Sequence, residues 1–317
     1  MPKTCSDPCR HALNGPTMGT RWSALFFAPP GFDPAPVAAA LQRAVDEVDA
    51  QMSLWRAESD LLRLNAAPAG DWVALPVQLM AVLALALQIG RASDGAFDIG
   101  VGDAVAAWGF GPAPADPGRI ARALHVPRPP AHELLELDPA RGRARKRAPV
   151  VLDLNGIAKG HGVDRLVATL RAHGIDAALA GIDGELRAMG LRPDGSAWPI
   201  AVEDPDPARR AARAVLALQD AAVATSGDYR HRVRVGGREL SHTMDPRRGG
   251  PLPDPPASVT VVAPDCASAD AWASALMVLG AERGAALARR LGLDALFLLR
   301  EDGAIRAQPV GRLFGAG

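Results

Sequence analysis

The sequence predicts an α+β protein whose sheets are largely antiparallel and are covered by packed helices. Long segments with helical apolar periodicity fall mainly at residues 35–52, 76–93 and 156–173. Short runs of β-forming residues follow one another almost directly between residues 177 and 263. Strands that follow strands favour antiparallel pairing, whereas a regular alternation of strands and helices would indicate a parallel sheet.

The N-terminal third predicts one strand followed by helices. Residues 1–15 are polar and are expected to form a loose N-terminal tail, which leaves residues 16–317 as a single domain. Residues 17–28 mix glycine with β-formers and predict the first strand. The segment 35–52 places Ala, Val and Leu on one face and acidic residues on the other, as an amphipathic helix does.

Two more helices and an irregular stretch follow. Residues 59–65 predict a short helix, and a longer one extends from Pro76 to about residue 93. Proline is favourable at a helix start, where its missing N–H needs no partner. Residues 111–149 are rich in Pro, Ala and Arg and show no sustained hydrophobic period. We therefore expect a long irregular segment there, with one hairpin at residues 134–145.

The second half begins with a predicted strand at residues 150–152, a glycine-bounded turn and a helix over residues 156–173. A helix from Ser268, its expected N-cap, to about residue 279 and another over residues 282–291 come near the end. The strands expected in this half are residues 177–180, 186–189, 199–202, 214–218, 222–225, 231–235, 239–243, 258–263 and 295–300.

Composition excludes several classes of protein. The 317 residues include 35 basic and 35 acidic side chains, a balance that does not favour binding to nucleic acid. Three cysteines cannot form a closed disulfide framework. No stretch approaches the roughly 18 consecutive apolar residues of a membrane span, so we expect no transmembrane segment. The first 20 residues lack the apolar core of a secretion signal, which predicts a cytoplasmic protein. An export segment missing from the sequence would instead place it in the periplasm or at a membrane.

Residues 150–162 (VVLDLNGIAKGHG) predict an anion-binding turn. The first turn of a helix has unpaired backbone N–H groups and a partial positive charge, so anions bind there. Lys159 adds a full positive charge, and Gly156 lets a ligand approach the backbone closely. An ordinary strand-to-helix connection with a surface lysine explains this stretch equally well when it is taken alone.

Three other polar clusters fall outside the expected core pattern. Residues 225–229 (TSGDY) place hydroxyl groups beside a glycine, which is also what a plain turn would do. His242 precedes a turn-forming Asp-Pro, and a lone His at a strand end is more often structural than catalytic. Asp270 and Ser274 are four residues apart and therefore share one face of a predicted helix. Their oxygens could ligate a hard cation, although Asp270 would also favour the helix dipole without any metal.

Together these clusters indicate chemistry at a phosphate group. An anion-binding helix start beside an oxygen-lined cation site suits the cleavage of a pyrophosphate or phosphate ester, since a bound Mg²⁺ offsets charge on phosphate oxygens and on the leaving group. Trp55 and Phe97 are aromatic side chains in polar surroundings that could pack against a planar ring.

In the order and amino-acid sequence of its polar segments, the chain resembles the ApbE-type FAD:protein FMN transferases, a family of flavin transferases. The resemblance covers about residues 17–299, and eight segments in one order are too many for a chance match. The segments are TMGTRW (17–22), MSLW with SDLLRLN (52–65), SDGAFDIGVG with WGFG (93–111), LDLNGIAKGHGVD (152–164), GIDGELRAMG (181–190), TSGDYR (225–230), HTMDPRRGGP (242–251) and SADAWASAL (268–276).

The resemblance implies an ApbE-like α+β fold, FAD as substrate and Mg²⁺ as cofactor. Members of the family cleave the FAD pyrophosphate, esterify FMN through its phosphate onto a Thr or Ser hydroxyl of a target flavoprotein, and release AMP. The implied metal ligands are the backbone carbonyl near Gly156 (with Ala158 as the neighbouring alternative), Asp270 and Ser274. His242 is the implied base for the acceptor hydroxyl. The implied flavin-nucleotide contacts are Met18, Trp55, Ala96, Phe97, Asp98, Asp153, Lys159 and Met244.

The chain departs from the family pattern at three positions. Ser274 stands where Thr is usual and keeps the hydroxyl ligand. Asp183 replaces the first of two glycines, and Arg248 replaces a Thr near the acceptor side. Two alternatives remain on sequence alone: an FAD pyrophosphatase that yields FMN and AMP, and a non-catalytic FAD-binding protein. Asp270 and Lys159, which are both retained, argue against the second.

Overall fold

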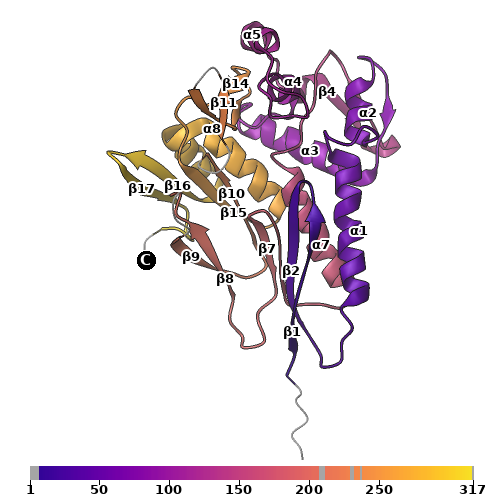
Figure 1. The fold of residues 1–317 in the computed structure, drawn as a ribbon, viewed down its shortest axis with the longest axis vertical. Coiled ribbons are helices and arrows are strands. Elements are labelled where there is room, and N and C mark those ends of the chain that lie inside the picture. The colour runs from indigo at the N-terminus through magenta and orange to yellow at the C-terminus, as the bar shows by residue number, and fades with distance from the viewer. Residues whose placement is uncertain (1–6, 207–210, 229–231, 236–237, 316–317) are drawn as a thin grey trace, which may run out of the picture.

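The protein is built on one eight-stranded sheet in which every neighbouring pair of strands is antiparallel. The computed structural model describes residues 7–206, 211–228, 232–235 and 238–315. The expected α+β class with largely antiparallel sheets is confirmed (Figure 1). In spatial order the strands are β1 (Cys9–Thr17), β2 (Thr20–Ala28), β6 (Ala178–Ile182), β7 (Glu185–Met189), β10 (Ala222–Gly227), β15 (Ser258–Ala263), β16 (Asp294–Glu301) and β17 (Ala304–Val310).

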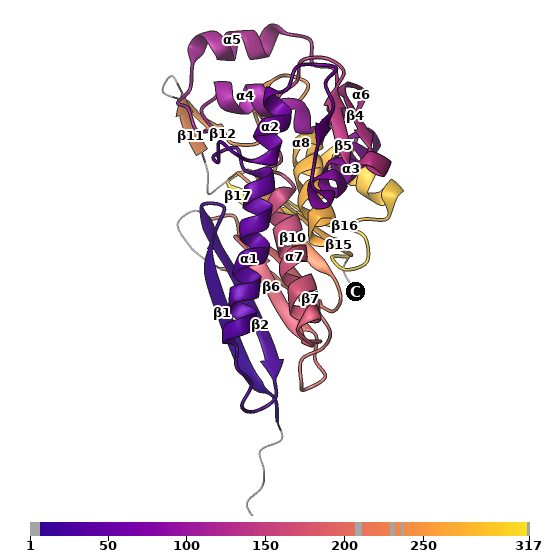
Figure 2. The same cartoon turned by 90° about the vertical axis from the view of Figure 1, so that its right-hand side faces the viewer.

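Three helices cover one face of this sheet: α1 (Ala35–Met52), α7 (Ala158–Ala172) and α8 (Cys266–Leu291) (Figures 1 and 2). Alternate strand residues point toward them, because side chains along a strand alternate between its faces. Trp22 and Phe26 of β2 accordingly pack with Leu41 of α1 and Leu166 of α7 in one buried cluster. The amphipathic pattern of each helix therefore decides which of its own faces packs against the sheet.

The opposite face is covered by a β-hairpin. Strands β8 (Trp198–Glu203) and β9 (Ala212–Leu218) pair with each other and form a separate sheet. The buried side chains of Trp198 and Leu216 pack against Val223, Val262 and other residues of the large sheet. The large sheet is thus buried on both sides over this region, which explains the continuous apolar run of β15.

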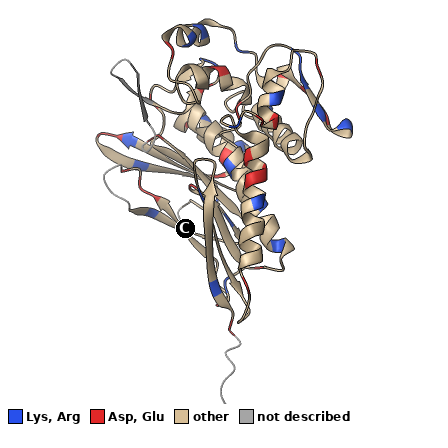
Figure 3. Ribbon diagram, turned by 45° about the vertical axis from the view of Figure 1, so that its right-hand side comes forward, with Lys and Arg blue, Asp and Glu red and all other residues tan. Residues whose placement is uncertain are grey.

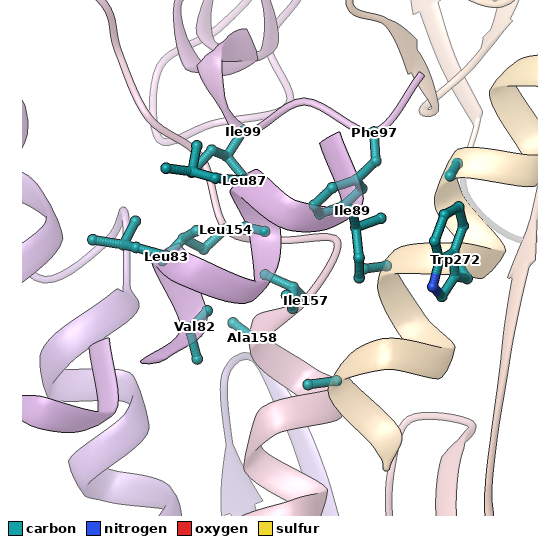
Figure 4. Close-up of a cluster of buried hydrophobic side chains, with 14 of the residues drawn as sticks. Val82, Leu83, Leu87, Ile89, Phe97, Ile99, Leu154, Ile157, Ala158 and Trp272 are labelled. Atoms are coloured by element: carbon teal, nitrogen blue, oxygen red, sulfur yellow. The ribbon is translucent and has the colours of Figure 1, made fainter. Parts of the chain in front are cut away.

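A second layer of structure packs against α8 and against the segment that precedes α7. Its core joins buried residues of α3, the segment before α7 and the middle of α8, such as Leu83, Leu154 and Trp272 (Figure 4). The elements of this layer are α2 (Asp60–Ala66), β3 (Val73–Ala74), α3 (Val77–Ala92), α6 (Ala131–Leu134), β4 (Leu135–Asp138) and β5 (Arg143–Lys146), with the order β3-β5-β4 in its small sheet.

The remaining elements are short helices and hairpins. They are η1 (Ile99–Val101), α4 (Gly102–Ala107), α5 (Pro117–His125), η2 (Pro139–Arg141) and two hairpins, β11 (Arg232–Val235) with β12 (Arg238–Ser241) and β13 (Met244–Asp245) with β14 (Gly250–Pro251). Helix α5 lies within the stretch expected to be irregular, whereas the hairpin expected there is present as β4 and β5. No helix among the described residues is long and apolar enough to cross a membrane.

Two predictions at chain level are wrong. The expected loose tail is ordered from Cys9, because residues 9–17 form β1 and pair in full register with β2. The expected strand at residues 150–152 is not a strand. The Asn65 side chain takes the place of a neighbouring strand there, since its Oδ1 accepts the N–H of Leu152 at 2.8 Å and its Nδ2 donates to the carbonyl of Leu152 at 2.9 Å.

The C-terminal helix also differs from expectation. Its N-cap is Asp265, whose Oδ1 accepts the N–H of Ser268, so the helix begins earlier than the expected cap. The two expected helices form the single element α8, interrupted at Gly280 by a non-helical φ of 74°. The last strand, β17, was not expected and completes the edge of the sheet by pairing with β16.

Candidate active site

A cleft of about 1230 Å³ lies where the two layers of the protein meet. It is bounded by the tip of the β1–β2 hairpin, the start of α7, the β6–β7 turn, α8 and the loops around residues 55 and 97. Every site residue inferred from the sequence lines this cleft: Met18, Trp55, Ala96, Phe97, Asp98, Asp153, Gly156, Lys159, His242, Met244, Asp270 and Ser274.

Asp153 sits in the turn before α7 and is 5% exposed. Its Oδ1 accepts the backbone N–H of Asn155 at 2.7 Å and its Oδ2 accepts the side-chain amide of Asn155 at 3.1 Å. Burial raises the pKa of Asp153 to about 6, although these two hydrogen bonds oppose the rise. Asp153 therefore shapes the turn and also presents a buried carboxyl group to the cleft.

Lys159 lies in the first turn of α7 and reaches toward the β6–β7 turn. Its Nζ is 2.9 Å from Oε1 of Glu185 and 3.3 Å from Oδ2 of Asp183. Burial opposes the charge on Lys159, but the carboxylates of Glu185, Asp270 and Asp183 outweigh it and raise its pKa. Lys159 is therefore a fixed positive charge at this end of the cleft.

Glu185 is a site residue that the sequence analysis did not assign. It is 4% exposed, lines the cleft and has one oxygen, Oε2, with no hydrogen-bond partner. Burial raises its pKa, and the ammonium of Lys159 opposes that rise. The available signal in the sequence was its position among strand-forming residues in the segment GIDGELRAMG. An acidic residue is rarely buried without a partner, so a buried Glu at this position indicates a paired charge.

Oxygen donors converge beside Lys159, where α7 approaches α8. Asp270 is 5% exposed and its Oδ2 accepts the backbone N–H of Gly160 at 3.0 Å. Burial and the neighbouring carboxyl group of Glu185 raise the pKa of Asp270 to about 7. A side chain at Gly156 would lie 3.2 Å from Oγ of Ser274, so the backbone of Gly156 directly faces that hydroxyl group.

This donor set fits Mg²⁺. Carboxylate, hydroxyl and carbonyl oxygens are its preferred protein ligands, and it usually keeps further positions for water and substrate phosphate. The described residues contain no group of three or more His, Cys, Asp or Glu side chains that could hold a metal by themselves. The carboxylate of Asp270 and the hydroxyl of Ser274 are oxygen donors of the kind that Mg²⁺ prefers, and both line the cleft. Ser226, whose Oγ is 3.2 Å from Oγ of Ser274, adds a second hydroxyl group that was not assigned from the sequence.

The lining of the cleft also includes apolar and aromatic side chains. Trp55 is 67% exposed, which is unusual for so large an apolar side chain, whereas Phe97 is buried in the core beneath. Met18 occupies the tip of the β1–β2 hairpin with a φ of 44°, a conformation that is uncommon for a residue other than glycine. These side chains offer a surface on which a planar ring can pack.

Asp98 lines the cleft and also stabilises the local backbone through hydrogen bonds. Its Oδ1 accepts the N–H of Gly100 at 2.7 Å and its Oδ2 accepts the N–H of Ala131 at 3.0 Å, so it joins the starts of η1 and α6. Burial raises the pKa of Asp98, and these backbone hydrogen bonds oppose the rise.

His242 lies between β12 and the β13–β14 hairpin, and Met244 begins that hairpin. Two side chains from elsewhere hold the hairpin in place. Nε1 of Trp108 donates to the carbonyl of Gly249 at 3.0 Å, and Arg247 forms an ion pair with Asp94 at 2.9 Å. These contacts join the β13–β14 hairpin, which follows His242 in the chain, to Trp108 and Asp94.

The chain is similar to known proteins over nearly its whole length. The model of the ApbE family matches residues 18–297. A Vibrio cholerae protein named FAD:protein FMN transferase is 34% identical over 306 residues, which cover 94% of this chain and 90% of that protein. The solved structure of Pseudomonas stutzeri flavinyl transferase ApbE superposes with a TM-score of 0.86 at 36% identity and covers 98% of both chains. The structure of flavin transferase ApbE from Vibrio cholerae gives a TM-score of 0.84 at 33% identity, over 96% of this chain and 97% of that one. The family match and the shared fold extend over nearly the whole chain, which therefore belongs to the ApbE family.

Proposed function

We propose that this protein is a Mg²⁺-dependent FAD:protein FMN transferase. It cleaves FAD, esterifies FMN through its phosphate onto a Thr or Ser hydroxyl of an acceptor flavoprotein, and releases AMP. The observation that carries this proposal is the convergence in one cleft of an aromatic surface, a fixed cation at Lys159 and the oxygens of Asp270 and Ser274. The names of its relatives support the same activity.

The proposed reaction is an in-line displacement at the phosphorus on the FMN side of FAD. The acceptor oxygen forms the new P–O bond, the bond to the AMP oxygen breaks, and the hydroxyl proton passes to His242. Lys159 orients the pyrophosphate, while Trp55 and Phe97 hold the isoalloxazine ring. Asp270, Ser274 and the backbone at Gly156 would hold Mg²⁺, which when bound would offset charge on the pyrophosphate and on the leaving AMP. Positioning and charge neutralisation account for most of the rate in such transfers.

The experiment that tests this proposal separates transfer from hydrolysis. The protein is incubated with FAD, Mg²⁺ and a folded acceptor domain with an exposed Thr or Ser, and the acceptor is analysed by mass spectrometry. We expect a covalent FMN adduct on the acceptor together with one AMP per adduct. Free FMN and AMP without an adduct on several acceptors would instead identify a pyrophosphatase. Bound FAD without turnover would identify a non-catalytic FAD-binding protein.

The role of His242 is tested by His242→Ala in the same assay. Because loss of a general base removes only proton transfer, we expect transfer to slow about 10²- to 10⁴-fold while FAD binding is retained. His125→Ala, an exposed histidine on α5, is the matched control and should behave as the wild type. A His242→Ala variant that loses FAD binding yet keeps its rate at saturating FAD would remove His242 from this role.

A further inference from the structure

The turn between β6 and β7 carries an acidic residue into the cleft. Asp183 and Gly184 connect the paired residues Ile182 and Glu185, with φ values of 54° and 122°. Two central residues with positive φ are typical of a type I′ hairpin turn, for which Asp-Gly and Asn-Gly are favoured pairs. Turn geometry therefore explains why Asp, Asn or Gly is suitable at position 183, but it does not explain a need for negative charge.

The charge of Asp183 is directed at Lys159. Its Oδ2 lies 3.3 Å from Nζ of Lys159, although that ammonium already has Glu185 at 2.9 Å. The side chain of Asp183 is 45% exposed, whereas that of Glu185 is 6% exposed, so Asp183 is the partner nearer to solvent and to an entering ligand. Both residues line the cleft.

The phosphate end of the cleft thus contains more acidic than basic groups. The carboxyl groups of Asp183, Glu185 and Asp270 all act on Lys159. The ammonium of Lys159, which already contacts Glu185 at 2.9 Å and Asp183 at 3.3 Å, has little attraction left for a ligand that is itself negatively charged. An anionic ligand must therefore displace a carboxylate from Lys159 or enter together with a positive ion.

We propose that Asp183 makes the binding of a phosphate-bearing ligand at Lys159 dependent on a divalent cation. By occupying Lys159 and adding negative charge, Asp183 disfavours entry of the ligand alone. A cation that enters with the ligand offsets this charge, so Asp183 then has little effect on affinity. Asp183 is a specificity-determining residue in this account, acting through Lys159. The inference rests on the proposed function in one respect, which is that the ligand is the pyrophosphate of FAD.

The test is to measure the dissociation constant of FAD by flavin fluorescence in buffer with EDTA and in buffer with Mg²⁺. Asp183→Asn removes the charge but keeps a residue suited to the turn. We expect this variant to bind FAD about fivefold more tightly than the wild type in EDTA, the effect of one partly exposed ion pair, and within twofold of the wild type in Mg²⁺. The gain in EDTA should shrink at high salt, because screening weakens charge interactions at partly exposed sites.

The matched control is Asp302→Asn. Asp302 and Gly303 form the same dipeptide turn between β16 and β17, with φ values of 50° and 77°, and Asp302 is exposed and does not line the cleft. We expect this variant to bind FAD as the wild type does in both buffers.

The outcomes that contradict the inference differ from those that contradict the function. If Asp183→Asn binds FAD in EDTA no more tightly than the wild type, or more weakly in both buffers, Asp183 does not impose cation dependence and the inference is wrong while FAD binding stands. If the wild type binds no FAD in either buffer, the proposed function is contradicted and the inference falls with it.

Discussion

Asp153 shows how one residue can serve both the fold and the site. It is buried at the end of the segment that leads into α7, and both of its oxygens accept hydrogen bonds from Asn155. Those bonds do not offset its desolvation, so its pKa lies at about 6 instead of the ordinary 3.8. The folded state consequently holds the proton of Asp153 more tightly than the unfolded state does.

This pKa predicts a pH-dependent effect of Asp153→Asn on stability. Above pH 6 the wild type must bury a charged carboxylate, and this cost disappears as the pH falls from about 6 to 3.8 because the folded state becomes protonated first. The cost corresponds to about 3 kcal/mol at most. We therefore expect Asp153→Asn to raise the free energy of unfolding in urea at pH 8 and to change it little near pH 4.

The exposed Asp302→Asn variant serves as the control and should show no such dependence. An Asp153→Asn variant that is destabilised equally at both pH values would show that hydrogen bonding, and not buried charge, determines the contribution of this residue.

At the scale of elements, the crossing of α7 and α8 fixes the distance between the two sides of the cation site. Gly160 makes this crossing possible, because a side chain there would overlap the backbone carbonyl oxygen of Cys266 at the start of α8. The same residue donates its N–H to Asp270. Close contact between the helices thus places Gly156 and Lys159 of one segment beside Asp270 and Ser274 of the other.

Gly160→Ala is expected to separate the two helices. Since backbone atoms cannot yield as a side chain can, we expect a loss of about 2–4 kcal/mol in the free energy of unfolding. Gly162→Ala, in the same helix, is the matched control: its new methyl group would meet only the ends of Ile182 and Met18, at 2.8 and 3.1 Å, and alanine favours a helix. Urea unfolding of both variants gives the comparison, and equal stabilities would show that the crossing tolerates a wider spacing.

Local sequence patterns predicted the helices and strands whose conformation is determined by residues within the same segment. The helix at residues 35–52 was predicted with the bounds of α1, because its apolar period lies within one segment. The strand expected at residues 150–152 failed because the partner of that backbone is the side chain of Asn65, 87 residues away. Helix α5 was missed because its nine residues, Pro117–His125, are too few to show a sustained apolar period within a stretch rich in Pro, Ala and Arg.

For the whole molecule, two hydrophobic cores share α7 and α8. Ala158 and Trp272 belong to the core of the second layer, while Leu166 and Ala269 belong to the core between the helices and the large sheet. The cleft lies where these cores adjoin, so its walls come from distant parts of the chain. Basic and acidic residues both occur on elements of both layers (Figure 3), and the formal net charge of the chain is zero.

The sequence could predict which polar segments belong to the site but not how they act on one another. The family resemblance assigned residues that all line one cleft. It did not assign Glu185 or Ser226, because their importance comes from contacts across the fold: Glu185 with Lys159, and Ser226 with Ser274. Such pairings depend on how β7, β10, α7 and α8 pack, which no local pattern encodes.

The measurement that tests the central claim most directly is a crystal structure with FAD and Mn²⁺, a Mg²⁺ substitute that can be located by its anomalous scattering. We predict one Mn²⁺ bound to the carboxylate of Asp270 and the hydroxyl of Ser274, in contact with the FAD pyrophosphate, and the isoalloxazine ring against Trp55. FAD bound elsewhere, or Mn²⁺ on the pyrophosphate without contact to Asp270, would contradict the assignment of this cleft as the site of FMN transfer.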